Sequence, residues 1–335
     1  MMIDTMITGA VLGLYVGDSL AAPSGSHRVA ILAPKRAARM RSLTEYSDLQ
    51  RQTTKPFPYT HAQPNWLLHP GASDDLEWFV FSAENFLKQG DPLPAWINLA
   101  QRREQIYART GTKIALKNLA DGLKPPHSGH DNPHYFDDIA MARSLGASLL
   151  FFKDEKTLST YVRKDAEITH SEDGIYCALA FAHFAAALIR EESIDSAIQI
   201  ALAQLPQGTW SRRIVELALE ETSNSNDLFT RVITLEHAII ENIYAFPVSA
   251  PETLALLLAH ARYAQNAHEL MLSALSHKRK LDSLPALAGA IAGIRFGTDW
   301  LPAQFLEGGE LSGVCIPEFK GKKIQPLIAA LITGI

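Results

Sequence analysis

The sequence has few of the features that mark secreted or membrane-spanning proteins. Its 335 residues include only two cysteines, too few for a disulfide framework or a cysteine-based zinc site. No Lys or Arg precedes Arg28, so the basic start of a secretory signal is missing. The longest nearly apolar run, Cys177–Ile189, is too short to cross a bilayer and contains His183. We therefore expect a cytoplasmic protein with no membrane partner.

An excess of positive charge is also missing. The chain has 31 Lys and Arg against 36 Asp and Glu, a net charge of −5 and a sequence pI near 6.2. Such a balance gives no electrostatic reason to bind a phosphate backbone, so there is no strong nucleic-acid signal. The hydrophobic share of 47% is ordinary for a globular protein and excludes disorder as the main state.

The alternation of apolar and polar residues that is typical of strands is absent, and no repeat of fixed period is found. Apolar residues instead recur every three or four positions in segments rich in Ala and Leu, which predicts helices. The predicted helices are Ile3–Leu20, Asp74–Leu87, Pro94–Tyr107, Thr112–Leu123, Ile139–Phe152, Glu155–Ile168, Asp173–Arg190, Ile194–Leu205, Arg212–Thr222, Leu228–Glu236, Pro251–Ala261, Asn266–Leu275, Leu284–Phe296 and Ile324–Ile335. Ser24–Gly71 is predicted to be irregular apart from a short helix near Lys35–Ser42. Since no linker divides the segments, we predict one all-α domain over residues 1–335.

Three glycines are spaced for close packing in the first predicted helix. Gly9, Gly13 and Gly17 recur every four residues and so lie on one helix face. In a chain that does not span a membrane, this spacing predicts that another backbone comes very close. Pro23 marks the predicted end of the helix.

A hydroxyl and two carboxylates stand together at the start of the second predicted helix. Ser73, Asp74 and Asp75 offer several hard oxygens within one turn, which suits Mg²⁺, Mn²⁺ or Ca²⁺. The same residues could simply cap the helix, with Asp74 as the cap and Glu77 three positions later. The local pattern leaves both interpretations open.

Two further polar groups stand at helix ends. Asp282 and Ser283 precede a helix of small residues, where they could either bind a ligand or cap the helix. Thr169 and His170 follow a predicted helix and could face a cleft. A histidine in such a place is also a common partner of the helix dipole.

Taken in order, these segments resemble the ADP-ribosylglycohydrolase family, whose founding member removes ADP-ribose from dinitrogenase reductase. The resemblance runs from Met6 to Leu306. The segments that match family motifs are Gly9–Pro23 for the glycine-rich helix ending in Gly-Asp-Ala-Leu-Gly-Ala-Pro, Ser73–Leu76 for Thr-Asp-Asp-Thr, Ala142-Arg143 for Met-Arg, Thr169-His170 for Thr-His, Lys280–Ser283 for Asp-Thr-Asp-Thr, and Gly297–Pro302 for the closing Gly…Ile-Pro stretch.

The resemblance implies a compact multi-helix orthogonal bundle with a site for two Mg²⁺ or Mn²⁺ ions. Such ions orient the ribose hydroxyls and a water for attack at the anomeric carbon. Matched residue by residue, the implied metal ligands are Ser73, Asp74, Asp75, Asp282 and Ser283. The candidate substrate-binding residues are Asp137, Asp138, Arg143, Thr169 and His170, of which the first two are placed only by their position in the substrate-loop region.

The chain departs from the family pattern at two charged positions. The family's Glu after Ala-Pro falls near Gly25, and the first Asp of the closing motif is Lys280. With the carboxylates Asp74, Asp75 and Asp282 and the Lys280 ammonium, the site would carry a formal charge of −2 in place of −5. Two dications would be poorly compensated there, so we expect at most one divalent ion. Lys280 either replaces the second ion or points to solvent beside its basic neighbours.

The main functional hypothesis is therefore a hydrolase that cleaves a ribosyl N- or O-glycosidic bond of an ADP-ribosylated substrate. Asp74 and Asp75 are the candidate catalytic residues, with Asp137 and Asp138 as substitutes for the missing Glu. The alternative is a catalytically inactive family member that binds ADP-ribose, a nucleotide or a protein partner. A third class, a structural protein that retains only the fold, has no need of both the Ser-Asp-Asp and the Asp-Ser motifs.

Overall fold

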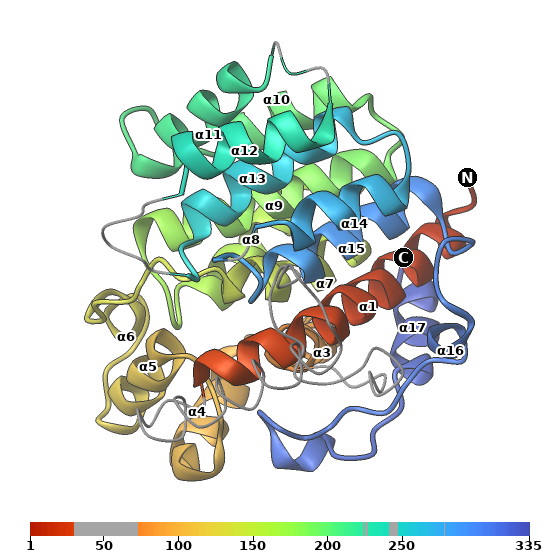
Figure 1. Ribbon diagram of the computed structural model, residues 1–335. Coiled ribbons are helices and arrows are strands. Elements are labelled where there is room, and N and C mark those ends of the chain that lie inside the picture. Colours follow the sequence, from red (N-terminus) through yellow and green to blue (C-terminus); the bar gives the residue numbers. More distant parts are fainter. Residues whose placement is uncertain (30–72, 224, 226, 241–246, 278) are drawn as a thin grey trace, which may run out of the picture.

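Helices make up nearly all of the regular structure in the part of the chain that is described (Figure 1). The computed structural model describes residues 1–29, 73–223, 225, 227–240, 247–277 and 279–335. The α-helices are α1 (Ile3–Val29), α3 (Asp74–Leu87), α4 (Leu93–Gln101), α5 (Thr110–Ala120), α6 (His127–His130), α7 (Ile139–Phe151), α8 (Glu155–Ala166), α9 (Glu172–Ile189), α10 (Ile194–Ala203), α11 (Trp210–Glu221), α12 (Leu228–Ala238), α13 (Ala250–Tyr263), α14 (Ala267–Leu275), α15 (Leu284–Phe296), α16 (Ala303–Leu306) and α17 (Gln325–Thr333). Two 3₁₀ turns are η2 (Arg103–Gln105) and η3 (Pro317–Phe319). Over these residues the β pairing consists of two isolated bridges, and the all-α prediction is confirmed.

Helix α9 forms the centre of the core. Its sequence is rich in alanine, so neighbouring helices can approach its axis closely, and α7, α8, α10 and α13 all pack against it. It is long and apolar enough to span a membrane, with a mean hydropathy of 1.3, but 83% of it is buried inside the protein. That burial is typical of the central helix of a packed core.

Helices α1 and α15 lie side by side and cross with their backbones in contact (Figure 1). A Cβ built at Gly13 would overlap the carbonyl oxygen of Gly289, and one built at Gly9 would overlap that of Gly293. Gly17 meets the carbonyl of Pro285 in the same way. The glycine spacing therefore did predict a close helix contact. The contact brings the end of this glycine face against the first turn of α15.

Several predicted boundaries are wrong. Helix α1 continues past Pro23 to Val29, because proline adopts helical φ and removes only one backbone donor. The segment predicted as one helix over Pro94–Tyr107 is divided into α4 and η2. Helix α6 follows Pro125 in a segment where no helix was predicted. The predicted helix near Lys35–Ser42 and most of Ser24–Gly71 lie outside the described residues.

Glu77 joins α3 to the C-terminal part of the chain. Its buried carboxylate accepts hydrogen bonds from the Ser312 hydroxyl (2.8 Å) and from the backbone N–H groups of Val314 (3.0 Å), Cys315 (2.8 Å) and Ile316 (3.1 Å). Four hydrogen-bond donors offset the free-energy cost of burying the charged Glu77 carboxylate without a cationic partner. Glu77 therefore anchors the C-terminal loop and is not the partner of a capping Asp74 that the sequence offered.

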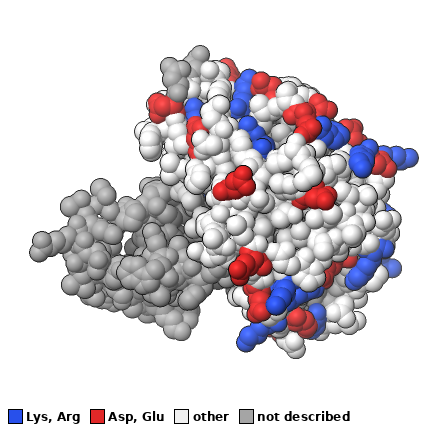
Figure 2. Space-filling model, turned by 90° about the vertical axis from the view of Figure 1, so that its right-hand side faces the viewer, with Lys and Arg blue, Asp and Glu red and all other residues white. Residues whose placement is uncertain are grey.

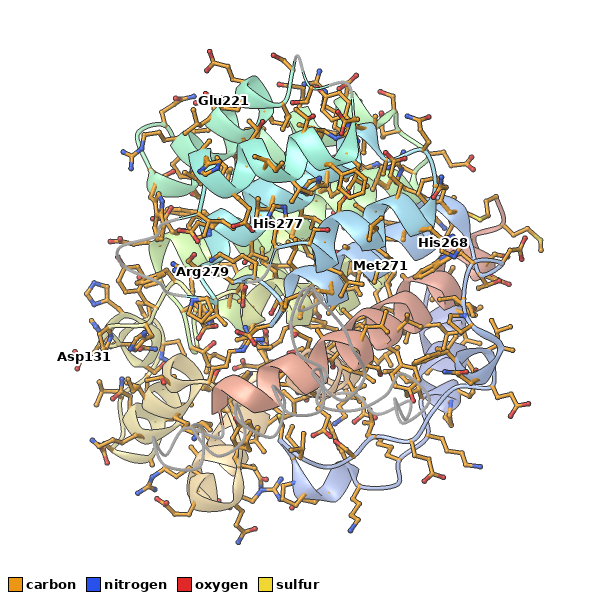
Figure 3. The ribbon with its side chains drawn as sticks, viewed as in Figure 1. Asp131, Glu221, His268, Met271, His277 and Arg279 are labelled. Carbon is orange, nitrogen blue, oxygen red and sulfur yellow. The ribbon has the colours of Figure 1, made fainter. Side chains whose placement is uncertain are left out.

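A buried pair of histidines connects α13 to the segment after α14. His277 is labelled in Figure 3. Its Nε2 lies 2.7 Å from His260 Nε2, and its Nδ1 lies 2.9 Å from a Glu236 carboxylate oxygen. Among the described residues, His260 Nδ1 has no hydrogen-bond partner. Burial, with His277 and Arg231 nearby, lowers the pKa of His260 well below its usual value.

On the face shown in Figure 2, acidic and basic side chains are interspersed, and the described part shows no extended basic patch there. Large apolar side chains are also exposed, among them Phe229 and Ile233 of α12. Scattered exposed apolar side chains are normal on protein surfaces.

We predict that Gly13→Ala destabilises the protein by roughly 1–3 kcal/mol, because the added methyl group would force α1 and α15 apart. Urea unfolding followed by circular dichroism measures this loss. Gly90→Ala is the matched control, because a Cβ there meets nothing within 4 Å. Equal stability of the two variants would contradict the close helix contact.

We predict that the free energy of unfolding falls as the pH decreases from about 6.5. The pKa of His260 is lowered in the folded protein, so the stability it contributes is complete above its unfolded pKa and is lost as the unfolded chain takes up the proton. The slope approaches about 1.4 kcal/mol per pH unit for one proton. His260→Gln should flatten the profile, whereas His268→Gln, at an exposed position, should not. If stability depends on pH in the same way in His260→Gln and His268→Gln, the assignment of this pH dependence to His260 is wrong.

Candidate active site

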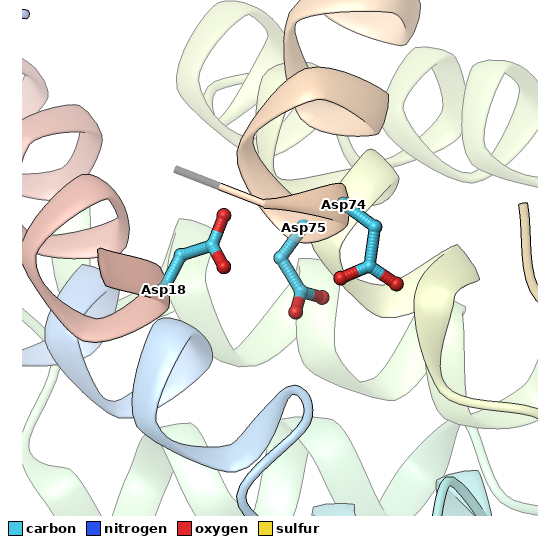
Figure 4. Close-up of side chains that lie close together, drawn as sticks. All are labelled: Asp18, Asp74 and Asp75. Carbon is cyan, nitrogen blue, oxygen red and sulfur yellow. The ribbon is translucent and has the colours of Figure 1, made fainter. Parts of the chain in front are cut away.

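Three carboxylates meet at the beginning of α3. Asp18 reaches this point from α1, and Asp74 and Asp75 lie in the first turn of α3 (Figure 4). One oxygen of each lies within 4.8 Å of the others, close enough to hold one metal ion. Asp18 and Asp75 are fully buried and Asp74 is half-buried. The sequence analysis placed the last two in the site and missed Asp18.

Asp18 caps α3 from another helix. Its Oδ2 accepts hydrogen bonds from the backbone N–H groups of Ser73 (2.9 Å) and Leu76 (3.0 Å). The Ser73 hydroxyl donates to Asp18 and makes no capping bond of its own. Since Asp18 satisfies the helix end, capping does not account for Ser73 and Asp74, which remain turned toward the cluster.

Arg109, the residue before α5, inserts its guanidinium among these carboxylates. Its Nε donates to Asp74 Oδ2 (2.7 Å), its Nη1 donates to Asp138, and its Nη2 lies 2.9 Å from Ser283 Oγ and 3.3 Å from Asp75 Oδ2. The side chain is only 11% exposed. One guanidinium thus joins residues from α3, from the start of α7 and from the start of α15.

Ser283 completes the contact from the side of α15. Its hydroxyl lies 2.7 Å from Asp75 Oδ1 and 3.0 Å from Asp138 Oδ1, and it makes no capping bond to its own helix. Asp138 Oδ2 accepts a hydrogen bond from Thr253 (2.7 Å). The Ser-Asp-Asp and Asp-Ser motifs, distant in sequence, are therefore in direct contact. Asp282, the other predicted ligand, is half-buried at the same end of α15.

Lys280 is buried, so the interpretation of this residue as a solvent-facing lysine is wrong. Its ammonium lies 2.5 Å from a Glu252 carboxylate oxygen and donates to Ser249 Oγ (2.6 Å). Desolvation lowers its pKa, and Glu252, Asp138 and Asp282 act in the opposite direction. Lys280 thus lies near the acidic site, but its close carboxylate partner is Glu252.

Burial and mutual repulsion dominate the electrostatics of the cluster. Desolvation, with Asp74 as the next cause, raises the pKa of Asp18 to about 7. Desolvation also raises the pKa of Asp75 well above its usual value, against the opposing effect of Arg109. For Arg109, desolvation is outweighed by the surrounding carboxylates, and its pKa is raised well above the usual value. The described site therefore carries an excess of negative charge that a cation would compensate.

A chain of buried hydrogen bonds supports the loop that carries Asp137 and Asp138. His170 Nε2 lies 2.9 Å from Asp137 Oδ1, and its Nδ1 lies 2.7 Å from Thr169 Oγ1. Because Arg143 Nη2 donates to Thr169 Oγ1 (2.8 Å), the Thr169 proton is directed to His170 Nδ1. That leaves His170 Nε2–H to donate to Asp137.

Asp137 at the end of this chain is fixed in the charged form. Desolvation would raise its pKa, but His170 and Arg109 outweigh it, and the pKa is lowered. Its Oδ2 has no hydrogen-bond partner among the described residues and lies close against the Cα of Gly111. A side chain larger than hydrogen at Gly111 would displace this carboxylate.

Arg143 forms the inner end of the chain. Its Nε donates to Asp165 Oδ2 (2.9 Å), and its guanidinium lies 4.8 Å from the ring centre of Trp96. Trp96 Nε1 and Ser82 Oγ donate to Asp165 Oδ1. Arg143, Thr169 and His170 are completely buried, so the structure places these three predicted substrate-binding residues behind the site.

The sequence contained a signal for some of the site residues that the sequence analysis missed, but not for others. Asp18 follows a long apolar stretch of α1 and comes directly after Gly17, which was a usable signal. Arg109 lies in a mixed polar stretch, and nothing local shows that its side chain reaches three carboxylates. Glu252 and Thr253 lie at the start of α13, where they read as ordinary first-turn residues.

Comparisons with known proteins agree with this arrangement. A family model described as ADP-ribosylglycohydrolase matches residues 3–333, nearly the whole chain. Among solved structures, the chain is similar to one titled "ADP-ribosylglycohydrolase-related protein complex", with 19% identity, a TM-score of 0.63, and coverage of 99% of this chain and 98% of that chain. That likeness concerns the fold. No curated protein gives a match.

We predict that Asp165→Asn destabilises the protein by about 3–5 kcal/mol, because it leaves the buried Arg143 guanidinium without its counter-charge. Denaturant unfolding at pH 7 measures the effect. Asp121→Asn removes the exposed pair with Lys117 and should change stability by less than about 1 kcal/mol. A small loss in both variants would mean that Asp165 does not hold Arg143 in place.

Proposed function

Because the chain belongs to the ADP-ribosylglycohydrolase family, we propose that it hydrolyses the N- or O-glycosidic bond joining ADP-ribose to an ADP-ribosylated substrate. The observation that carries the proposal is the convergence of Asp18, Asp74 and Asp75 beside Ser283. A site that had lost its function would have no need to bring both motifs into contact. The expected location in the cytoplasm is part of the proposal.

The residues present fit one divalent ion. Carboxylate and hydroxyl oxygens are the hard ligands that Mg²⁺ and Mn²⁺ prefer, and Asp18, Asp74 and Asp75 present them within 4.8 Å of one another. Their burial leaves negative charge that backbone N–H groups and Arg109 compensate only in part. A divalent ion held there would polarise water and orient the ribose hydroxyls.

The protein's own residues divide into those that face the substrate and those that support them. Asp74 is the most exposed carboxylate of the cluster, with 18% of its side chain accessible, and is assigned as the acceptor of the water proton. Asp75 is oriented by the Ser283 hydroxyl, and Asp138 by Thr253. Asp137 and Asp138 are themselves buried, and they support the site through His170 and through Arg109 and Ser283.

In the reaction, a water oxygen adds to the anomeric carbon and its proton passes to Asp74. The glycosidic C–N or C–O bond breaks, and its electron pair stays on the leaving nitrogen or oxygen. The leaving group then takes up the proton. His170, Thr169 and Arg143 act as positioning residues, because their hydrogen bonds end at Asp137.

We predict that the protein releases ADP-ribose from ADP-ribosylated peptides or proteins in the presence of Mg²⁺ or Mn²⁺, and that EDTA reduces the release. Asp74→Asn should lower kcat by about 100-fold or more, because an amide cannot accept the proton. Asp4→Asn, an exposed position on the same helix as Asp18, should leave kcat unchanged. Chromatographic detection of free ADP-ribose measures each rate.

The same preparation separates the two candidate functions. Retained ADP-ribose binding by calorimetry without turnover of any substrate would favour the inactive family member that binds ADP-ribose. Neither binding nor turnover would overturn the proposal.

A further inference from the structure

We propose that Arg109 is a built-in cation that takes the place of a second divalent ion in the acidic site. The inference rests on the proposed function only for the identity of the ion at Asp18, Asp74 and Asp75. The positive charge of the second ion is assigned to Arg109, at the N-terminus of α5. It is not assigned to Lys280, whose ammonium contacts Glu252 and Ser249.

The contacts of Arg109 resemble the ligand set of a bound cation. Carboxylates from two elements and one hydroxyl surround the guanidinium: Asp74 and Asp75 from α3, Asp138 from the start of α7, and Ser283 from the start of α15. An arginine on the protein surface would keep its guanidinium group in contact with water. Here all three nitrogens donate to the site, and the side chain is 11% exposed.

These contacts also use the oxygens that a second ion would require. Asp75 Oδ2 and Asp74 Oδ2 face Arg109, while Asp75 Oδ1 accepts from Ser283. Asp138 Oδ1 is shared by Arg109 and Ser283, and its Oδ2 accepts from Thr253. Arg109 therefore lies between Asp74, Asp75 and Asp138, at the position that a second ion would take.

Charge compensation points the same way. Arg109 supplies one positive charge to Asp74, Asp75 and Asp138, which is the kind of compensation that a second ion would otherwise supply.

The backbone around Arg109 holds it in this position. Two residues earlier, the Tyr107 N–H donates to the Cys315 carbonyl (3.0 Å), in the loop that Glu77 anchors to α3. Two residues later, Gly111 packs against Asp137 with no space for a side chain. Arg109 is thus fixed on both sides by contacts to the site's own supports.

The test is the number of Mn²⁺ ions bound per chain. We expect one for the wild type and two for Arg109→Gln, measured by calorimetric titration of metal-stripped protein and by the spin coupling of paired Mn²⁺ ions. Arg109→Lys keeps the charge and should still bind one. Arg102→Gln removes an arginine that pairs with Glu318 near the surface, and should match the wild type.

Thermal stability gives a second readout that does not depend on catalysis. In EDTA, Arg109→Gln should melt below the wild type, because Asp74, Asp75 and Asp138 lose their counter-charge. Saturating Mn²⁺ should raise its Tm by more than that of the wild type, since an additional ion binds only the folded state. If Arg109→Gln fails to fold in EDTA, refolding that requires Mn²⁺ supports the proposal, and refolding that Mn²⁺ does not restore overturns it.

Two ions bound to the wild type, or the same stoichiometry and affinity in Arg109→Gln as in the wild type, would overturn the proposal. No ion in the wild type but one in Arg109→Gln would support the built-in cation and contradict the metal part of the proposed function. If the ion number changes as expected but the wild type hydrolyses no ADP-ribosylated substrate, the proposed function alone is overturned.

Discussion

The contact between the α1 and α15 backbones is the constraint on which the site depends. Glycines on both helices let the chains meet with no side chain between them. Asp18 directly follows the last of these glycines in α1, and Ser283 directly precedes α15. The contact therefore brings an acid from one end of the chain and a hydroxyl from the other to the same turn of α3. A separation of the two helices by the width of one methyl group would move both groups away from Asp75.

The buried charges of the site are tolerated because each is compensated in a different way. Asp18 accepts two backbone N–H groups at the start of α3, where the helix dipole also favours negative charge. Asp74, Asp75 and Asp138 share one guanidinium, and Lys280 and Glu252 form a pair of their own. Asp137 has a hydrogen bond to His170. Removal of any one partner would leave an isolated charge in a low-dielectric interior, which is far more costly than the intact arrangement.

The helical fold and half of the site could be predicted from the sequence, because both depend on local sequence patterns. Apolar spacing and alanine content predict helices, and adjacent motifs such as Ser73–Asp75 show their chemistry without the fold. Arg109 could not be found in this way, since its role depends on where three other elements lie. The burial of Lys280 was equally hidden, because Glu252 is its partner only in the folded chain. The continuation of α1 past Pro23 shows that a single proline does not by itself end a helix.

The pairing of α1 with α15 also determines when the site can form during synthesis. Helix α1 is apolar on nearly all sides in its first half, and its partner lies close to the far end of the chain. At about 5–20 residues per second, translation leaves α1 without α15 for a time on the order of tens of seconds. During that interval its glycine face has no backbone to cover it, and the nascent chain presents an apolar helix to any chaperone at the ribosome. The ribosome must thus synthesise α15 before Asp18 and Ser283 can meet.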